Sequence, residues 1–394
     1  MRMRITSTTP STGTTGRRGV DRAVGAPRRL AVITASAVAL IAASLVPATS
    51  ARAFTPAPPD FYGVAVSTAL TREDFHRLAA ANIRTVRIPM SWPDLATGPG
   101  KYNWLNYDGS VIHAAEAGIT VIPTLRGSPG FVSNNNNRPP LDSNEERALW
   151  QDFVRSAVER YGPGGEFWNF VRVCPPHPGH CRPDLPYRPF EVWQVWNEPN
   201  LGRFWQPGPS PGEYAELLEL TSDAVKGVDP GAEVITGGLM PGGRGAPNSV
   251  PQNDFLAGLY QRGADEHFDG LDLHPYQRKP KQARARVQEA RAMMQAYGDG
   301  ETPIWITEIG WSIKGPKDDD QVTNRKGQAK RLVQMMRMLT AVRGTLNIRL
   351  ASWFTYQDPN FKICEWCHGA GLFDNKGNAK PAWKKYVGVT GGRR

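Results

Sequence analysis

Two glutamates stand directly after apolar segments of this chain. The apolar run Val192–Trp196 stops abruptly on Asn197-Glu198-Pro199-Asn200, and Glu308 follows Trp305-Ile306-Thr307 in the same way, 110 positions later. A carboxylate at the end of a buried strand is costly unless something there needs it. Two carboxyl groups on either side of a glycosidic bond can divide the work, one as an acid and one as a nucleophile or charge stabiliser.

Other chemically useful side chains lie within apolar segments or just after them. They are Arg87, Asn197, His274, Tyr276, Trp311 and Trp353. Tyr276 can donate a hydrogen bond that keeps one carboxylate ionised, and aromatic rings match the apolar faces of sugars. The alternative for Glu198 and Glu308 is a buried structural ion pair, with Arg87 balancing either charge. For His274 it is a satisfied core group, and for Trp353 a plug of the barrel.

The elements that must position these residues are eight apolar segments, most of them followed by helical periodicity. The segments are 61–67, 85–90, 120–125, 192–196, 233–236, 270–274, 303–307 and 350–355. Helices are predicted over 72–82, 145–161, 213–228, 282–297 and 326–342, with a shorter one near 256–260. This alternation predicts an α/β fold, a single-domain (β/α)8 TIM barrel over 54–394.

A doubly wound sheet is the structural alternative to the barrel. No glycine-rich phosphate loop follows the first strand, which counts against a dinucleotide-binding version. The longest stretch without predicted structure is 162–189, rich in Pro and Gly, which we expect to be a surface excursion. In a barrel the carboxyl ends of the strands carry the chemistry, so Glu198 and Glu308 should face one another across its mouth.

The first 53 residues predict an export signal. A basic stretch is followed by an apolar run from Leu30 to Val46 and by Ser50-Ala51-Arg52-Ala53, a small-x-small cleavage site. An uncleaved anchor is the alternative, and Arg28-Arg29 leaves Sec and twin-arginine export both open. The segment holds eight Arg and one Asp, which is seven of the ten net positive charges. The remainder shows no basic-aromatic stripe, so we expect no nucleic-acid partner and no stable membrane association after cleavage.

The four cysteines fall into two close pairs, Cys174 with Cys181 and Cys364 with Cys367. Disulfides are the default for an exported protein. A zinc site is the competing interpretation, because His177 and His180 lie between the members of the first pair. We predict no metal and no cofactor.

The two segments that contain Glu198 and Glu308 are similar to those of a known enzyme group. "WQVWNEPN" followed by "PIWITEIGW" resembles the retaining glycoside hydrolases of clan A, whose (β/α)8 barrels carry catalytic glutamates on strands four and seven. The sequence looks closest to family 39 and related secreted actinobacterial proteins, and the "GGL" after strand five and the terminal "GLFDNKGNAKPAW" are similar to them. The resemblance covers nearly all of 54–394.

The resemblance implies a role for each residue. Glu198 would be the general acid/base and Glu308 the nucleophile. Asn197 would contact the sugar 2-OH, and Tyr276 and Arg87 would orient the nucleophile. His274 would support the acid/base or line a subsite, and Trp353 would form the floor on which the sugar stacks. Trp311 would line the substrate site. The clan often has His or Asn at the end of strand three, where this chain reads Thr124-Leu125-Arg126-Gly127, so the substrate-defining subsite stays open.

The sequence therefore predicts a secreted, monomeric, cofactor-independent retaining glycoside hydrolase acting on an oligo- or polysaccharide. Two alternatives remain: a transglycosylase on the same site, and a catalytically silent carbohydrate-binding barrel. The basic loop Arg278-Lys279-Pro280-Lys281 follows strand six near the expected mouth. It is either a solvated surface or a contact for an acidic sugar. The sugar and its linkage do not follow from the fold.

Overall fold

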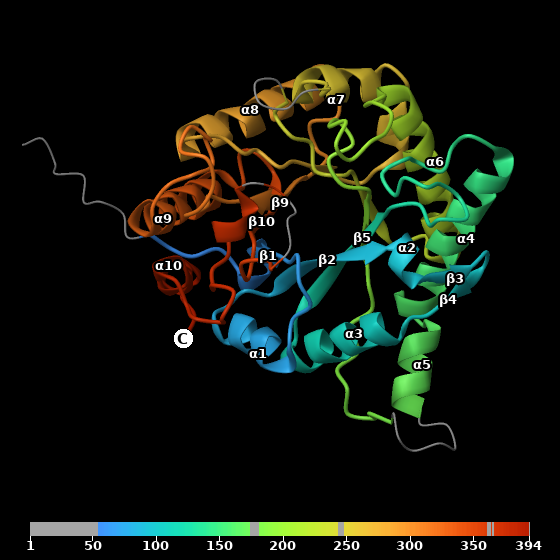
Figure 1. Ribbon diagram of the computed structural model, residues 1–394, viewed down its shortest axis with the longest axis horizontal. Helices are drawn as coiled ribbons and strands as arrows, with labels where there is room; N and C mark the ends of the chain where they lie inside the picture. The colour runs from blue at the N-terminus through green and yellow to red at the C-terminus, as the bar shows by residue number, and fades with distance from the viewer. Residues whose placement is uncertain (1–53, 174–180, 243–247, 361–363, 365, 394) are drawn as a thin grey trace, which may run out of the picture. The chain divides into compact units, whose positions relative to one another are not determined.

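The computed structural model describes residues 54–173, 181–242, 248–360, 364 and 366–393. Within them, eight parallel strands form one sheet in the order β7-β6-β5-β2-β1-β10-β9-β8 (Figure 1). Bridges from Ile235 to Gly270 and from Leu239 to Leu273 join β7 to β8 and close the ring. The strands are β1 Tyr62–Ala65, β2 Thr85–Ser91, β5 Thr120–Arg126, β6 Val192–Val195, β7 Glu233–Ile235, β8 Leu271–Asp272, β9 Ile304–Ile309 and β10 Ile348–Phe354. This confirms the (β/α)8 barrel and excludes the doubly wound sheet.

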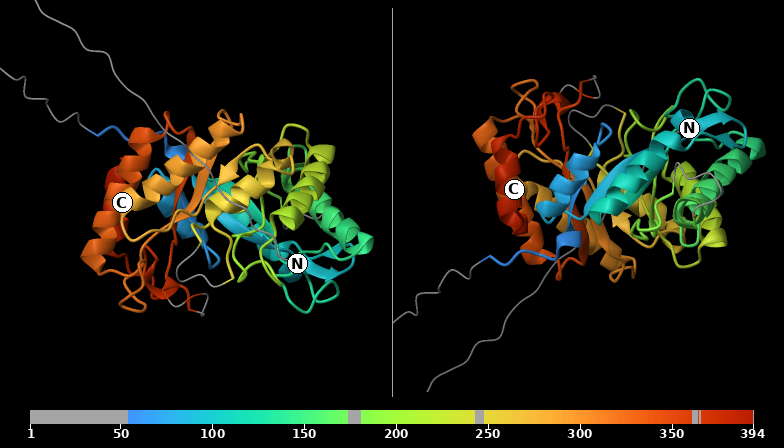
Figure 2. Two further views of the ribbon diagram at one scale, coloured as in Figure 1. Left: turned by 90° about the horizontal axis from the view of Figure 1, so that it is seen from above. Right: turned by 90° about the horizontal axis from the view of Figure 1, so that it is seen from below.

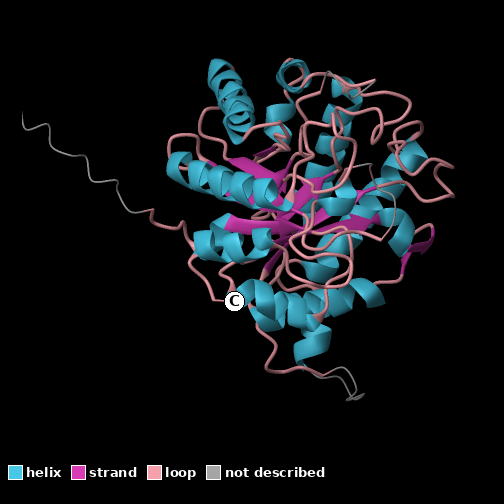
Figure 3. Ribbon diagram, turned by 60° about the vertical axis from the view of Figure 1, so that its left-hand side comes forward, coloured by secondary structure: helices cyan, strands magenta, loops and turns pink. Residues whose placement is uncertain are grey.

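Helices cover the outside of the strands, as Figures 2 and 3 show. Several begin at side chains that accept a backbone N–H of the first turn: Thr71 before α1, Ser143 before α4, Ser210 before α6 and Asn324 before α9. The helices are α1 Arg72–Ala80, α2 Trp92–Leu95, α3 Leu105–Ala117, α4 Asn144–Tyr161, α5 Glu166–Val173, α6 Pro211–Val228, α7 Gln252–Tyr260, α8 Pro280–Ala296, α9 Arg325–Val342 and α10 Pro381–Thr390.

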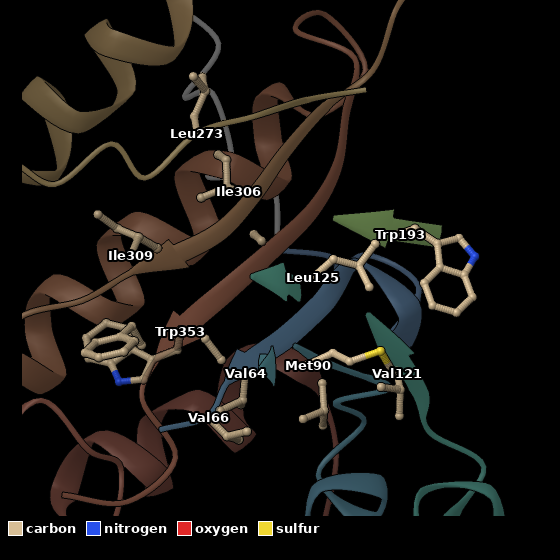
Figure 4. Packing of buried hydrophobic residues seen from close by; sticks show 14 of the residues in the cluster. Val64, Val66, Met90, Val121, Leu125, Trp193, Leu273, Ile306, Ile309 and Trp353 are labelled. Atoms are coloured by element: carbon tan, nitrogen blue, oxygen red, sulfur yellow. The ribbon is translucent and has the colours of Figure 1, made fainter. Parts of the chain in front are cut away.

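The core has two layers because side chains alternate along each strand. One set packs between strands and helices, where Figure 4 shows residues such as Met90, Leu125 and Ile306. The other set fills the barrel. Its lower part is a small apolar cluster of Ile122, Ile235, Trp305 and Leu350. Polar side chains lie above this cluster, toward the carboxyl ends of the strands.

Several described elements were absent from the sequence prediction. Helices α2, α3, α5 and α10 were not predicted, and α5 lies inside the stretch 162–189 that was expected to be irregular. A short hairpin of β3 (Ala96–Gly98) and β4 (Lys101–Tyr102) follows β2. The helix α5 buries Phe167 and Trp168, so tertiary packing outweighs the many Pro and Gly residues that surround it.

The disulfide Cys364–Cys367 is present. Cys181 is also disulfide-bonded, whereas its predicted partner Cys174 lies outside the described residues, as do His177 and His180 of the zinc alternative. Residues 1–53, with the predicted export signal, lie outside them too. None of the helices in the described part is long and apolar enough to span a membrane.

Candidate active site

Glu198 reaches the barrel mouth through an irregular end of β6. Trp196 and Glu198 have backbone φ angles of 67° and 47°, the left-handed region that non-glycine residues rarely occupy. Asn200 holds the turn, since its amide donates to the carbonyls of Met240 (2.8 Å) and Val250 (2.9 Å). Strained backbone that its surroundings hold in place is typical of functional sites. The strand ends on Asn-Glu-Pro because this turn aims the carboxylate inward.

Glu308 reaches the mouth through an irregularity in β9. Ala351 of β10 pairs with Ile306, but Trp353 pairs with Ile309, so two steps along β10 match three along β9. The extra residue breaks the alternation of side chains, as in a β-bulge. Thr307 faces the barrel interior, and Glu308 also faces the mouth instead of the surrounding helices.

Two donors engage the Glu308 carboxylate. The Arg87 guanidinium pairs with Oε1, and the Tyr276 hydroxyl donates to Oε2 at 3.0 Å. Arg87 also donates to Asn197 Oδ1 at 2.7 Å, which leaves the Asn197 amide N–H₂ as a donor. Burial and the Glu308 charge raise the pKa of Tyr276 well above its usual value, so this hydroxyl remains a donor. The cation and the hydroxyl together fix the orientation of the Glu308 carboxylate.

Glu198 has a different partner. His274 Nδ1 lies 2.8 Å from Glu198 Oε1 and 3.7 Å from Glu308 Oε2. Burial lowers the pKa of His274, but Glu308, Glu198 and Asp272 outweigh it, and the net shift is upward. Gly238 makes room for this ring, because a Cβ at that position would lie 2.1 Å from imidazole atoms. Glu198 and His274 thus form a buried pair that can hold a shared proton.

A buried polar chain beneath the mouth links the two glutamates. The other His274 nitrogen, Nε2, lies 2.9 Å from Thr307 Oγ1, and that hydroxyl donates to Asp272 Oδ2 at 2.5 Å. Gln194 donates to Asp272 and accepts from Arg87 Nε at 2.5 Å. Because the Thr307 proton points at Asp272, Nε2 must carry the imidazole proton, and Nδ1 is the atom that shares a proton with Glu198.

Asp272 is fully buried beneath the His274 ring. Desolvation raises its pKa to about 6, although His274 and Arg87 act in the opposite direction. Its carboxylate accepts hydrogen bonds from Gln194, from the Thr307 hydroxyl and from the Thr307 backbone N–H (2.9 Å). Asp272, Thr307 and Gln194 were not selected from the sequence. Their inward register on β8, β9 and β6 is the signal that would have found them.

The predicted stacking role of Trp353 is wrong in this structure. Trp353 lies on the outward-facing side of β10, is completely buried, and donates its indole N–H to the Ala370 carbonyl (3.0 Å). Trp311 is equally buried, donates to the Gln277 carbonyl and packs against Trp353, so it does not line the site either. Along β10 the inward-facing positions are Leu350, Ser352 and Phe354.

The aromatic side chains next to the predicted site are Phe354 and Trp366. Trp366 is partly exposed, and its ring lies 5.2 Å from that of Tyr276 and 6.0 Å from that of Phe354, measured between centroids. The inward-facing aromatic residue at the end of β10 is therefore Phe354, one position after the predicted Trp353. The sequence showed a Trp at the strand end, but only the pairing with β1 reveals which face it occupies.

Glu198, His274 and Glu308 each offer one ligand atom, and these three atoms lie within 4.8 Å of one another. Such a group could in principle hold a metal ion. However, both Glu308 oxygens are already engaged by Arg87 and Tyr276, and the Arg87 charge opposes a second cation. The donor set therefore fits two carboxylates that act on an organic substrate better than it fits a metal site.

Comparisons with known proteins agree with this geometry. Residues 194–386 match the family of the glycosyl hydrolase catalytic core. A β-xylosidase of Geobacillus stearothermophilus is 34% identical over 199 residues, which are 46% of this chain and 34% of that protein. A probable glucan 1,3-β-glucosidase A of Aspergillus fumigatus is 26% identical over 180 residues, 43% of this chain and 36% of that protein. The matches span about a third of these relatives' own length.

The fold has solved counterparts. A family 39 glycoside hydrolase from Bacteroides cellulosilyticus WH2 superposes with a TM-score of 0.58 at 19% identity, over 84% of this chain and 64% of that one. At this identity the likeness concerns the fold. The family match includes both Glu198 and Glu308. Residues 194–386, the part of the chain that carries the site, thus match the family of the glycosyl hydrolase catalytic core.

Proposed function

We propose that this protein is a retaining O-glycoside hydrolase in which Glu308 is the nucleophile and Glu198 the general acid/base. One observation carries the proposal: a carboxylate oxygen of each glutamate lies within 4.8 Å of the other, and the two have unlike partners. Retaining enzymes place their carboxyl groups about 5–5.5 Å apart, whereas inverting enzymes leave about 6.5–9.5 Å for a water molecule. The short separation supports the retaining route.

The proposed reaction has two steps. The Glu308 carboxylate attacks the anomeric carbon, the bond from that carbon to the leaving oxygen breaks, and the proton held by Glu198 and His274 goes to that oxygen. Water then attacks the glycosyl-enzyme, gives a proton back to Glu198, and releases Glu308 as a carboxylate. Asn197 is positioned to donate its amide N–H to a sugar hydroxyl, because Arg87 occupies its carbonyl oxygen.

We further propose an oligo- or polysaccharide substrate with a β-type linkage. Support comes from the curated relatives, one named a β-xylosidase and the other a probable glucan 1,3-β-glucosidase. We also propose export with removal of residues 1–53, which the Cys364–Cys367 disulfide supports because such bonds persist in oxidising compartments. A monomeric state stays a prediction.

A turnover panel tests the proposed function. The full-length protein and its Glu198→Gln and Glu308→Gln variants would be produced in an exporting host and assayed on aryl β-xylosides, β-glucosides and β-galactosides and on wall polysaccharides. Loss of turnover in Glu308→Gln on every substrate that the wild type cleaves is the expected result. Full activity of that variant would overturn the proposal. Product analysis with an added sugar acceptor separates hydrolysis from transfer.

A further inference from the structure

Arg126 is a cation at the barrel mouth that the proposed reaction does not use. It is the last residue of β5, the third strand of the barrel in chain order. Side chains two apart on this strand share a face. Ile122 belongs to the apolar cluster inside the barrel, and Thr124 donates to the buried Gln194 at 2.8 Å. Arg126 therefore continues the inward-facing row one level higher, at the mouth.

No described residue forms an ion pair with Arg126. Among the described residues, no carboxylate lies within ion-pair distance of its guanidinium, and it makes no hydrogen bond to them. Both catalytic candidates have other contacts, since Glu308 binds Arg87 and Tyr276 while Glu198 binds His274. In the described part of the chain, the Arg126 guanidinium carbon lies 6.0 Å from the ring centroid of Phe204.

This placement has an energetic cost. Arg126 is half-buried, and both burial and the neighbouring Arg87 charge lower its pKa, whereas Glu198, Glu308 and Asp94 act in the opposite direction. Two guanidinium groups near one another in a partly dehydrated mouth repel, and a desolvated charge without a hydrogen-bonded partner is destabilising. A planar guanidinium fork is also the side chain best suited to bind a carboxylate or sulfate through two parallel hydrogen bonds.

We propose that Arg126 binds an anionic group of the substrate, so that the enzyme prefers an acidic sugar, a uronate or a sulfated residue, over its neutral counterpart. This inference rests on the proposed function for its catalytic consequence, but the binding itself requires no turnover. The shared chemistry is a planar or tetrahedral oxyanion beside the catalytic pair. The Phe204 ring lies next to the guanidinium, as in a cation–π contact.

The test measures binding to the Glu308→Gln variant of the full-length chain, in which turnover is removed. The probes are methyl β-D-glucuronide, methyl β-D-galacturonide and 6-sulfated methyl β-D-glucoside, with neutral methyl β-D-glucoside and β-D-galactoside as their counterparts. Tryptophan fluorescence or ligand-observed NMR gives each Kd. The expected result is tighter binding of at least one anionic probe, with carboxylate and sulfate probes separating the two sources of the anion.

Substitution of Arg126 then identifies the residue responsible. Arg126→Gln should weaken the preferred anionic probe by about 10- to 100-fold, the usual effect of a charge-assisted hydrogen bond, and change the neutral probes less than about threefold. Arg126→Lys keeps the charge without the fork and should lie between. Arg203→Gln is the matched control, because Arg203 stacks on the same Phe204 ring at 5.1 Å but is exposed.

Three outcomes overturn the inference: tighter binding of neutral than of anionic probes, an equal loss for both kinds in Arg126→Gln, or an equal loss in Arg203→Gln. An equal loss would mean that Arg126 only balances the two glutamates. The thermal midpoint of each variant checks that it is folded, and Arg126→Lys serves if Arg126→Gln is not. Activity of wild type on any neutral glycoside, lost in Glu308→Gln, would leave the proposed function standing after any of these outcomes.

Discussion

The surroundings of Glu308 and Glu198 differ although both glutamates lie at the same mouth. Glu308 has a guanidinium on one oxygen and a phenol on the other. Glu198 contacts a single imidazole whose far side is tied to a buried aspartate through Thr307. Fixed donors favour a carboxylate that never needs a proton, whereas a titratable partner suits one that must give up a proton and take it back.

This difference shows how one scaffold separates two identical side chains. The two glutamates reach the mouth by different backbone routes: a left-handed turn at Trp196 and Glu198 follows β6, and the irregular pairing of β9 turns Glu308 inward. Each irregularity delivers its carboxylate to a different set of partners. The roles therefore follow from local backbone geometry as much as from residue type.

The largest expected effect is that of Glu308→Gln. Its amide cannot form the glycosyl-enzyme, so turnover should fall by on the order of 10⁴–10⁶, the effect of removing a catalytic nucleophile. Initial rates on aryl glycosides and on polysaccharide should fall together. Loss of only the polysaccharide activity in this variant would indicate that Glu308 is the acid/base and Glu198 the nucleophile.

Glu198→Gln should produce a loss that depends on the leaving group. Activity on substrates with poor leaving groups should fall by about 10²–10⁴, while the first step with activated aryl glycosides, which need no protonation, should change little. A plot of rate against leaving-group acidity measures this. Equal losses across the series would contradict the assignment of Glu198.

Removing a donor from Glu308 should have a smaller effect. Tyr276→Phe deletes one hydrogen bond to a charged group and should reduce kcat/KM by about 10- to 100-fold. Tyr356→Phe is a suitable control, because Tyr356 is also buried but bonds to Asp74 (2.6 Å) and Arg77 (2.9 Å) at α1. A comparable loss in both variants would show that the effect is structural.

Asp272→Asn should shift the pH profile more than it lowers the maximum rate. The Asp272 charge raises the pKa of His274, together with Glu308 and Glu198, while burial acts against it. Without that charge the proton shared by His274 and Glu198 is lost at lower pH, so the basic limb of kcat/KM should move to lower pH. Thr307→Val, which keeps the aspartate, should weaken activity with a smaller shift. An unchanged basic limb in Asp272→Asn would show that Asp272 does not influence the proton shared by His274 and Glu198.

The same variant makes a prediction about stability. The pKa of Asp272 is about 6 in the folded protein, above its usual 3.8, so its contribution to stability is present at low pH and is lost as the pH rises through 6. Relative to wild type, Asp272→Asn should therefore be more stable at pH 7 than at pH 4. The free energy of unfolding of the variant minus that of wild type should be larger at the higher pH. Denaturant melts at both values measure it, and a pH-independent difference would contradict the buried, raised aspartate.

Much of this could be predicted from the sequence because parallel strands buried on both faces are continuous apolar runs. All eight barrel strands, the barrel itself and the positions of Glu198, Glu308, Arg87, Asn197, His274 and Tyr276 at or near its mouth agree with the structure. Their catalytic and substrate-binding roles stay predictions. Apart from Arg87, which lies within a strand, each of these side chains follows or ends an apolar segment, and strand ends are where barrels carry their sites.

The remainder depends on register, which composition does not encode. Trp353 and Phe354 are neighbours on β10, yet pairing with β1 places one under the helices and the other at the mouth. Asp272 lies two residues before His274, and Thr307 directly precedes Glu308, so both are close in sequence to residues that were predicted. Helix α5 was missed because its amphipathic residues lie within a stretch rich in Pro and Gly.

The stereochemistry of the first product tests the central claim most directly. ¹H NMR of the anomeric proton would be recorded during hydrolysis of a β-glycoside that the turnover panel identifies. Two glutamates with oxygens within 4.8 Å of one another predict that the β-anomer appears first and then mutarotates. Initial release of the α-anomer would mean inversion, and would contradict both the nucleophilic role of Glu308 and the account built on its surroundings.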